Sequence, residues 1–256
     1  MKSTEAYILC GTPRTGSTLL CALLQATGVA GIPESYFREP DEPTWAAQWG
    51  ITRTEDGTFS DADYVKAAFK AGRTENGVFG VRVMWGSMEL LIDRLRVIYS
   101  NDGSKLLDLL ERAFGSTRFV HLRREDILAQ AISWLRAEQT DIWHRTAPAI
   151  SLPQTSSPRF DFDELRRYSA LIDAHNEAWD LWFAEVGVQP YALKYEDLDS
   201  DPIGTTCALL KFLDLHVPAG VTITAPNVRL ADEVTIEWME RYRAMTTAEN
   251  LSIPQQ

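Results

Sequence analysis

The stretch Ala6-Tyr-Ile-Leu-Cys-Gly-Thr-Pro-Arg-Thr-Gly-Ser-Thr18 decides the fold class of this chain. Its first five residues form a continuously apolar run, as expected for a strand that is covered on both faces. The run breaks at Gly11, and from Ser17 to Thr27 leucines recur at helical spacing, with Gly28 at the stop. A strand, a short loop and a helix in this order predict the first unit of an α/β domain.

Further strands and helices extend this unit along the chain. Additional strands are predicted at residues 77–83, 118–122 and 190–195. Helices are predicted at residues 125–145, 161–186, 200–213 and 232–245. The long helix begins with a capping box, because Asp161 and Glu164 stand three residues apart at its start. Strands that alternate with helices predict an α/β fold with a parallel sheet and helices on both faces.

Two stretches interrupt the alternation. Residues 31–63 are rich in Pro, Glu, Asp and Trp and are predicted to form loops with a short helix around 44–49. Residues 146–158 are rich in Pro, Ser and Thr and are predicted to form a surface loop. The simplest prediction is a single domain over 1–256 with loop insertions at these two places.

The charge balance restricts the partners of this chain. Its 256 residues include 25 basic and 36 acidic side chains, which gives a net charge of −11. That balance argues against nucleic acid or an anionic membrane as the main partner, because both require a basic face. An anionic ligand must instead be met by arginines and backbone dipoles that are concentrated at one place.

Cysteine usage and hydropathy indicate the compartment. Cys10 and Cys207 lie in apolar runs and are predicted to be core thiols, and no Cys or His spacing suits a metal. No secretory signal is expected at the start, and no run approaches the ~20 apolar residues of a membrane span. We therefore predict a cytoplasmic protein that binds no metal.

The first loop has the spacing of a phosphate-binding loop but lacks its lysine. Gly11, Gly16 and Thr18 match G-x-x-x-x-G-K-[ST], whereas Ser17 stands where the lysine is required. Enzymes that use nucleoside triphosphates need that lysine on the β- and γ-phosphates. Arg14 is the only cation in the loop, so the pattern predicts an anion site of another kind. The alternative is an ordinary strand-to-helix turn.

A second cationic element follows the third predicted strand. Arg124 lies at the end of that strand, and Ser133 follows nine residues later on the next helix. Ligands of parallel sheets bind outside the carboxyl ends of the strands, so Arg124 can share a crevice with the first loop. A ligand with phosphates at both ends of an adenosine would need two such anion sites. The alternative is a pair of solvated arginines in the first turn of a helix.

Five segments together resemble the bacterial trehalose 2-sulfotransferase family. They are Thr12–Leu20, Gly31-Ile-Pro-Glu-Ser-Tyr-Phe37, Val83-Met-Trp85, Arg124–Arg136 and Glu237-Trp-Met-Glu-Arg-Tyr-Arg243. The resemblance implies a sulfotransferase fold related to the P-loop nucleotide kinases. It also implies 3′-phosphoadenosine-5′-phosphosulfate (PAPS) as sulfuryl donor, 3′,5′-adenosine diphosphate as product, no metal, and often a homodimer.

The same resemblance implies roles for individual residues. Arg14, Thr15, Gly16, Ser17 and Thr18 would surround the 5′-phosphosulfate, with Arg14 stabilising charge during transfer. The 3′-phosphate would be held by Arg124 and Ser133. Arg229, in a late loop, would close over the nucleotide.

The catalytic base does not transfer directly from the family pattern. In the trehalose enzymes a carboxylate immediately precedes an aromatic pair, but here Ser35 precedes Tyr36-Phe37 and Glu34 comes one position earlier. Glu34 is the first candidate for the base, followed by Glu39 and Asp41. His121 lies within a predicted strand, and we expect it to be a buried, structural residue.

The acceptor is predicted by class only. A carbohydrate or glycolipid hydroxyl is favoured, with trehalose as one candidate, and Arg82 or Trp85 at the end of the second strand would contact it. Trp45, Trp49 and Trp134 could stack on sugar rings, although tryptophans at helical spacing usually belong to the core. Two other readings stay open: a small-molecule kinase or NTPase of related fold, and a catalytically inactive nucleotide-binding relative.

Overall fold

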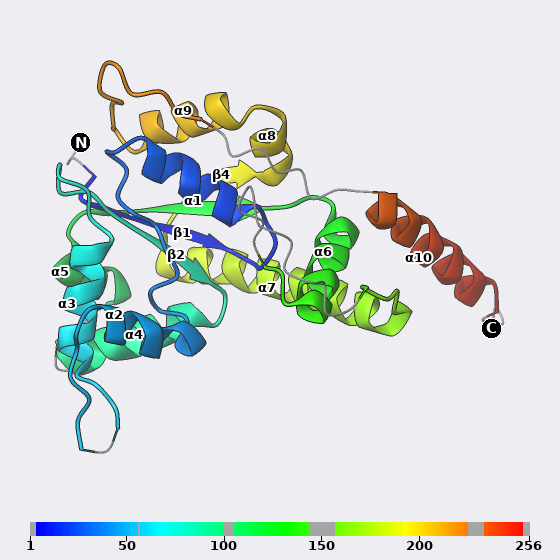
Figure 1. Ribbon diagram of the computed structural model, residues 1–256, viewed down its shortest axis with the longest axis horizontal. Coiled ribbons are helices and arrows are strands. Elements are labelled where there is room, and N and C mark those ends of the chain that lie inside the picture. Colours follow the sequence, from blue (N-terminus) through cyan, green and yellow to red (C-terminus); the bar gives the residue numbers. More distant parts are fainter. Residues whose placement is uncertain (1–3, 56, 100–104, 144–156, 225–232, 253–256) are drawn as a thin grey trace.

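Four parallel strands form the sheet at the centre of the protein, in the order β2-β1-β3-β4. The structure is a computed structural model, and it describes residues 4–55, 57–99, 105–143, 157–224 and 233–252. The strands run in the same direction across the middle of Figure 1. They are β1 (Ala6–Gly11), β2 (Phe79–Met84), β3 (Thr117–Arg123) and β4 (Tyr191–Lys194).

Strand β1 lies inside the sheet and is buried over its whole length. Successive side chains of a strand point to opposite faces, so β1 supplies both layers of core. Ala6, Ile8 and Cys10 pack into one apolar cluster, and Tyr7 and Leu9 pack into another. The continuously apolar run at the start of the sequence is explained by this two-sided burial.

Helices cover both faces of the sheet, as predicted for an α/β fold. One face packs against α1 (Ser17–Ala26), α8 (Tyr195–Ser200) and α9 (Pro202–Phe212), which lie above the sheet in Figure 1. The other face packs against α2 (Glu42–Gln48), α3 (Asp61–Ala71), α4 (Ser87–Ile98), α5 (Leu106–Phe114) and α7 (Phe162–Val186).

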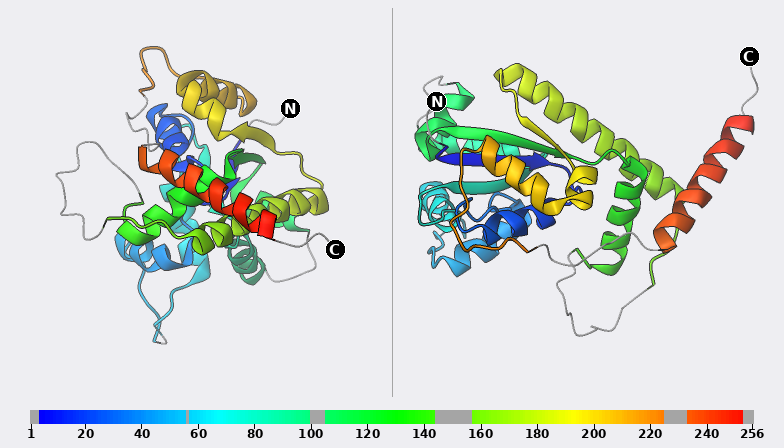
Figure 2. Two further views of the ribbon diagram at one scale, coloured as in Figure 1. Left: turned by 90° about the vertical axis from the view of Figure 1, so that its right-hand side faces the viewer. Right: turned by 90° about the horizontal axis from the view of Figure 1, so that it is seen from above.

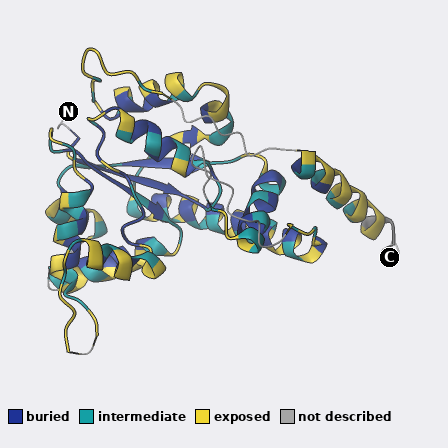
Figure 3. Ribbon diagram, in the orientation of Figure 1, coloured by how far each residue is buried: buried dark blue, intermediate teal, exposed yellow. Residues whose placement is uncertain are grey.

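A third apolar cluster lies beyond the carboxyl ends of the strands. It joins α6 (Ile127–Thr140), α7 and α10 (Glu233–Ser252), with Trp238 of α10 buried against α6 and α7. Figure 2 shows that α10 projects from the rest of the molecule, and Figure 3 shows exposed residues along most of it. Only the first turns of α10 therefore belong to the core.

The predicted elements differ from the observed ones at their ends. Helix α6 begins at Ile127, after its N-cap Asp126, and ends at Thr140 rather than at 145. The helix expected over 200–213 is preceded by a separate short helix, and Asp201 caps α9 with Pro202 in its first turn. Cys207 was expected in the core, but it lies on the outer face of α9 and is exposed. Within the described residues, no helix is both long enough and apolar enough to cross a membrane.

Trp179 of α7 connects the long helix to the end of β1. It is fully buried, and its indole Nε1–H donates to the Gly11 carbonyl over 3.0 Å. We expect Trp179→Phe to lower the free energy of unfolding by about 1–3 kcal/mol, because it removes this hydrogen bond and leaves a cavity.

Thermal denaturation of Trp179→Phe would check this prediction, with Trp182→Phe as the control variant. Trp182 is only partly buried and also packs on Trp179, but no indole hydrogen bond is seen for it among the described residues. Equal losses of stability in the two variants would contradict a special role for the Gly11 contact.

Candidate active site

The loop between β1 and α1 has a backbone that favours glycine at one position. Gly16 has φ of 80°, in the left-handed region, and Arg14 also has a positive φ of 67°. A Cβ on Gly16 would lie 2.5 Å from a ring carbon of Tyr195. A side chain at position 16 is therefore opposed both by the backbone and by the ring that packs against the loop.

Side chains from two helices hold this loop in place. Gln130 of α6 donates from Nε2 to Thr12 Oγ1 (2.8 Å) and to the Pro13 carbonyl (2.6 Å). The buried Thr15 hydroxyl donates to the Thr12 carbonyl (3.0 Å), and Trp179 holds Gly11. The loop is thus fixed before any ligand binds, as a preorganised anion site requires.

The first turn of α1 presents its backbone N–H groups without a side-chain cap. Gly16 is the N-cap residue and supplies no capping hydrogen bond, and no acidic residue lies in the first turn. The first N–H groups of a helix have no acceptor within the helix, so such an end attracts an anion. Ser17 is buried at the start of this turn, while Thr18 is exposed.

Arginines from separate segments converge beside the loop. Arg14 donates from Nε to Ser133 Oγ of α6 over 2.9 Å, and it also donates to the Trp143 carbonyl. The Arg124 guanidinium lies 4.4 Å above the Tyr195 ring, which itself packs against Gly16. The pKa of Arg14 lies below its usual value because the group is largely buried and because Arg124, and then Arg136, repel its charge.

This arrangement fits a ligand that carries negative charge. Within the described part of the chain, neither Arg14 nor Arg124 has a carboxylate partner, and Nε of Arg124 is buried without a hydrogen-bond acceptor. Cations held together without counter-charges cost folding free energy, which an anion would recover. The sequence-predicted cofactor residues Arg14, Gly16, Arg124 and Ser133 are brought together here.

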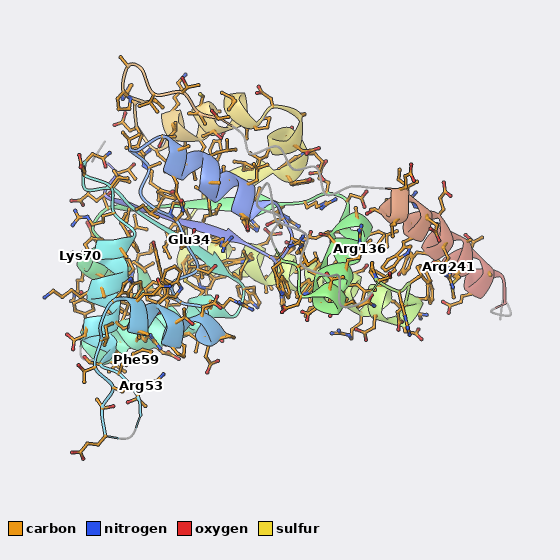
Figure 4. The ribbon with its side chains drawn as sticks, viewed as in Figure 1. Glu34, Arg53, Phe59, Lys70, Arg136 and Arg241 are labelled. Atoms are coloured by element: carbon orange, nitrogen blue, oxygen red, sulfur yellow. The ribbon has the colours of Figure 1, made fainter. Side chains whose placement is uncertain are left out.

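Glu34 lies in a network with Arg82 of β2 and Gln25 of α1. Its segment runs beside β2, where the Arg82 N–H donates to the Glu34 carbonyl over 3.0 Å. The Glu34 carboxylate accepts from Gln25 Nε2 (3.1 Å) and lies 3.7 Å from Arg82 Nη2. Its side chain is 36% exposed, so a second molecule can reach it. Figure 4 shows Glu34 beside α1.

Arg82 connects this acid to the first turn of α1 rather than pointing into solvent. Its guanidinium donates to Ser35 Oγ (2.8 Å) and to Thr18 Oγ1 of α1 (3.0 Å), as well as pairing with Glu34. One side chain thereby touches the residue predicted to bind the donor and the residue predicted to act as base.

The other acids and the buried histidine have different surroundings. Glu39 is exposed in the 3₁₀ turn Glu39–Asp41, and Asp41 pairs with Arg38 over 3.0 Å. His121 is 4% exposed, as predicted for a structural residue, and burial, with a smaller effect of Arg123, lowers its pKa to about 4. A histidine that is neutral and enclosed in this way is poorly placed to meet a substrate.

The predicted aromatic contacts divide between the site and the core. Trp85 follows β2 directly and packs edge-on against Trp179, with 5.1 Å between ring centroids. Trp45 and Trp49 stack on one another and pack around Tyr36, and both lie against the main core cluster. Trp134 is buried against Tyr168. Of these, only Trp85 adjoins the carboxyl end of the sheet.

Several contacts of the site were not predicted from the sequence. They involve Tyr195, Gln25 and Arg136, and the position of Tyr195 directly after β4 is the one signal that could have indicated it. Arg229, predicted to close over the nucleotide, lies outside the described residues.

The chain is similar in sequence to known sulfotransferases. A family model described as Stf0 sulphotransferase matches residues 6–245. A trehalose 2-sulfotransferase of Mycolicibacterium smegmatis is 30% identical, over 93% of this chain and 94% of that protein. A trehalose 2-sulfotransferase of Mycobacterium tuberculosis is 29% identical, over 99% of each chain. A solved sulfotransferase of Alicyclobacillus acidocaldarius superposes with a TM-score of 0.44 at 14% identity, covering 95% of this chain and 93% of that one.

These matches argue against the kinase or NTPase that the sequence left open. The family model spans both anion-binding elements and the Glu34 segment, and neither curated relative is a kinase. The missing lysine at Ser17 is consistent with this outcome. The chain therefore belongs to the Stf0 sulphotransferase family and is a sulfotransferase.

Proposed function

We propose that this enzyme transfers the sulfuryl group of PAPS to a hydroxyl of a carbohydrate, with trehalose as the first candidate. The observation that carries the proposal is the convergence of Arg14 and Arg124, both without a carboxylate partner in the described residues, on a loop whose helix is uncapped. A donor with anionic groups at both ends matches two cationic positions. The trehalose 2-sulfotransferases that align along nearly all of the chain support the acceptor class.

The donor supplies a sulfuryl group bound to the oxygen of a phosphate, and the enzyme has to position it and stabilise the charge left behind. In this proposal Arg14 and the N–H groups at the start of α1 hold the 5′-phosphosulfate and the developing phosphate charge. Thr15, Ser17 and Thr18 complete that loop, and Arg124 with Ser133 holds the 3′-phosphate. Arg14 is then a catalytic residue as well as a binding residue.

Glu34 is proposed to remove the proton from the acceptor hydroxyl. A bond forms between that oxygen and sulfur while the bond between sulfur and the phosphate oxygen breaks, and the proton passes to the Glu34 carboxylate. Arg82 and Gln25 orient this carboxylate. Trp85, which follows β2, is the proposed apolar contact for the acceptor.

A transfer assay with an acceptor panel tests the function. We expect labelled sulfate to pass from PAPS to trehalose faster than to maltose, sucrose or a simple glycolipid, because the trehalose enzymes are the relatives that align over the whole chain. ATP with Mg²⁺ serves as control, and it should stabilise the protein against heat less than 3′,5′-adenosine diphosphate does.

Stabilisation by the bisphosphate without transfer to any acceptor would instead support a nucleotide-binding protein without activity. A single domain over 1–256 with loop insertions near 31–63 and 146–158, a cytoplasmic location and a homodimer stay predictions.

A further inference from the structure

The side of α6 that faces the donor loop (the β1–α1 loop, residues 12–16) carries three polar residues about one turn apart, of which Gln130 already contacts the loop. Ser133 accepts a hydrogen bond from Arg14, and Arg136 follows three residues later. Residues at this spacing lie on the same side of a helix. Figure 4 shows Arg136 on α6, between the body of the protein and α10. Arg136 is therefore the next cation along the helix from the Arg14–Ser133 contact.

The position of Arg136 is set partly by α10. Its Nη1 donates to Thr235 Oγ1 over 3.0 Å, and Thr235 is 7% exposed in the first turn of that helix. Trp238, one turn later, packs into the apolar cluster on α6 and α7 and fixes α10 there. A long arginine side chain loses rotamer freedom when it is held in this way, so it can meet an anion without further ordering.

The charge of Arg136 acts on the donor loop. Arg124 and Arg136 both repel the guanidinium of Arg14 and contribute, after burial, to the lowered pKa of that group. Such a contribution indicates that Arg136 lies close to Arg14, whereas the sequence places them 122 positions apart, at 14 and 136.

We propose that Arg136, held by Thr235, is a third arginine of the donor site and recognises the 3′-phosphate together with Arg124 and Ser133. The proposal rests on the proposed function, in which the donor is an adenosine with phosphates at both ends. It assigns to α10 a part in donor selectivity, because the helix that protrudes from the molecule supplies the residue that positions Arg136.

Calorimetric titration of two nucleotides tests the proposal. The probes are 3′,5′-adenosine diphosphate and adenosine 5′-monophosphate, which differ only in the 3′-phosphate. The quantity measured is the dissociation constant of the monophosphate divided by that of the diphosphate, so a larger ratio means a stronger preference for the 3′-phosphate. We expect Arg136→Ala to reduce this ratio at least about tenfold while the monophosphate affinity stays within about twofold. Arg136→Lys should keep part of the ratio, since it keeps the charge but not the planar fork.

Thr235 gives a second test that leaves Arg136 in place. Thr235→Val should lower the ratio about threefold or more, and Thr235→Ser, which retains the acceptor, should restore it. Arg96→Ala is the matched control, because Arg96 is an exposed arginine of α4 that pairs with Asp93 and should leave the ratio unchanged.

The outcomes separate this inference from the proposed function. A wild-type protein that binds both nucleotides equally would overturn the bisphosphate donor, and the role of Arg136 with it. A wild-type preference that survives unchanged in Arg136→Ala and in Thr235→Val would leave the donor intact and reduce Arg136 to a structural link between α6 and α10.

Discussion

Replacing Glu34 by glutamine is expected to lower turnover by about 10²–10⁴-fold while the affinity for 3′,5′-adenosine diphosphate stays within about twofold. Glutamine has the same shape and can still accept from Gln25, whose Nε2 lies 3.1 Å from the Glu34 carboxylate, but it cannot take a proton. Steady-state rates with PAPS and the preferred acceptor, together with equilibrium nucleotide binding, measure the two quantities separately.

Two neighbouring acids provide controls for this substitution. Glu39→Gln and Asp41→Asn should leave turnover nearly unchanged, because Glu39 is exposed outside the network and Asp41 pairs with Arg38. If Glu34→Gln kept full activity and one of these two variants lost it, the base would have to be reassigned to that residue. The one-residue offset from the family pattern would then reflect a different loop conformation.

The elements that could be predicted from the sequence are those whose signal is local. The β1 strand is buried on both faces and reads as an unbroken apolar run, and Asp161 accepts from the Glu164 N–H at the start of α7 as the capping box indicates. The donor loop could be recognised for the same reason, since strand, glycine and helix follow one another directly. Ser133 contacts Arg14, so the helix that follows Arg124 turns this residue toward the loop.

The features that could not be predicted depend on contacts between distant segments. Nothing near Arg82 in the sequence indicates that it reaches Thr18 on one side and Ser35 on the other, 64 and 47 positions away. Nothing near Thr235 in the sequence indicates that it accepts a hydrogen bond from Arg136, 99 positions away. For Trp45 and Trp49, the sequence shows only that the side chains could stack on a sugar. Their packing around Tyr36 becomes evident only in the fold.

Arg82 illustrates how such a contact changes the interpretation of a residue. From its place at the end of the second strand it was expected to touch the acceptor. Its guanidinium is shared among Thr18, Ser35 and Glu34, and its side chain is 12% exposed, while the contact with the acceptor stays a prediction. A residue that connects the first turn of α1 to the base can align the two reacting groups without binding either substrate directly.

Substitution of Arg14 is expected to have the second large effect. It should weaken nucleotide binding and slow sulfuryl transfer while it changes the stability of the protein little. Arg14→Ala should weaken 3′,5′-adenosine diphosphate binding by about 10–100-fold, since a charge-assisted contact contributes about 1.5–3 kcal/mol. The rate of sulfuryl transfer should fall further, by about 10²–10³-fold, because Arg14 is proposed to stabilise charge that develops during the reaction.

The stability of the ligand-free protein should change by less than about 1 kcal/mol in the same variant. Alanine loses the hydrogen bonds to Ser133 and to the Trp143 carbonyl, but it also removes a largely buried charge that Arg124 and Arg136 repel. Urea unfolding without ligand and nucleotide titration of Arg14→Ala and Arg14→Lys measure both effects, with the lysine variant expected between alanine and wild type. A strongly destabilised alanine variant that bound nucleotide normally would show that Arg14 holds the loop together and does not meet the donor.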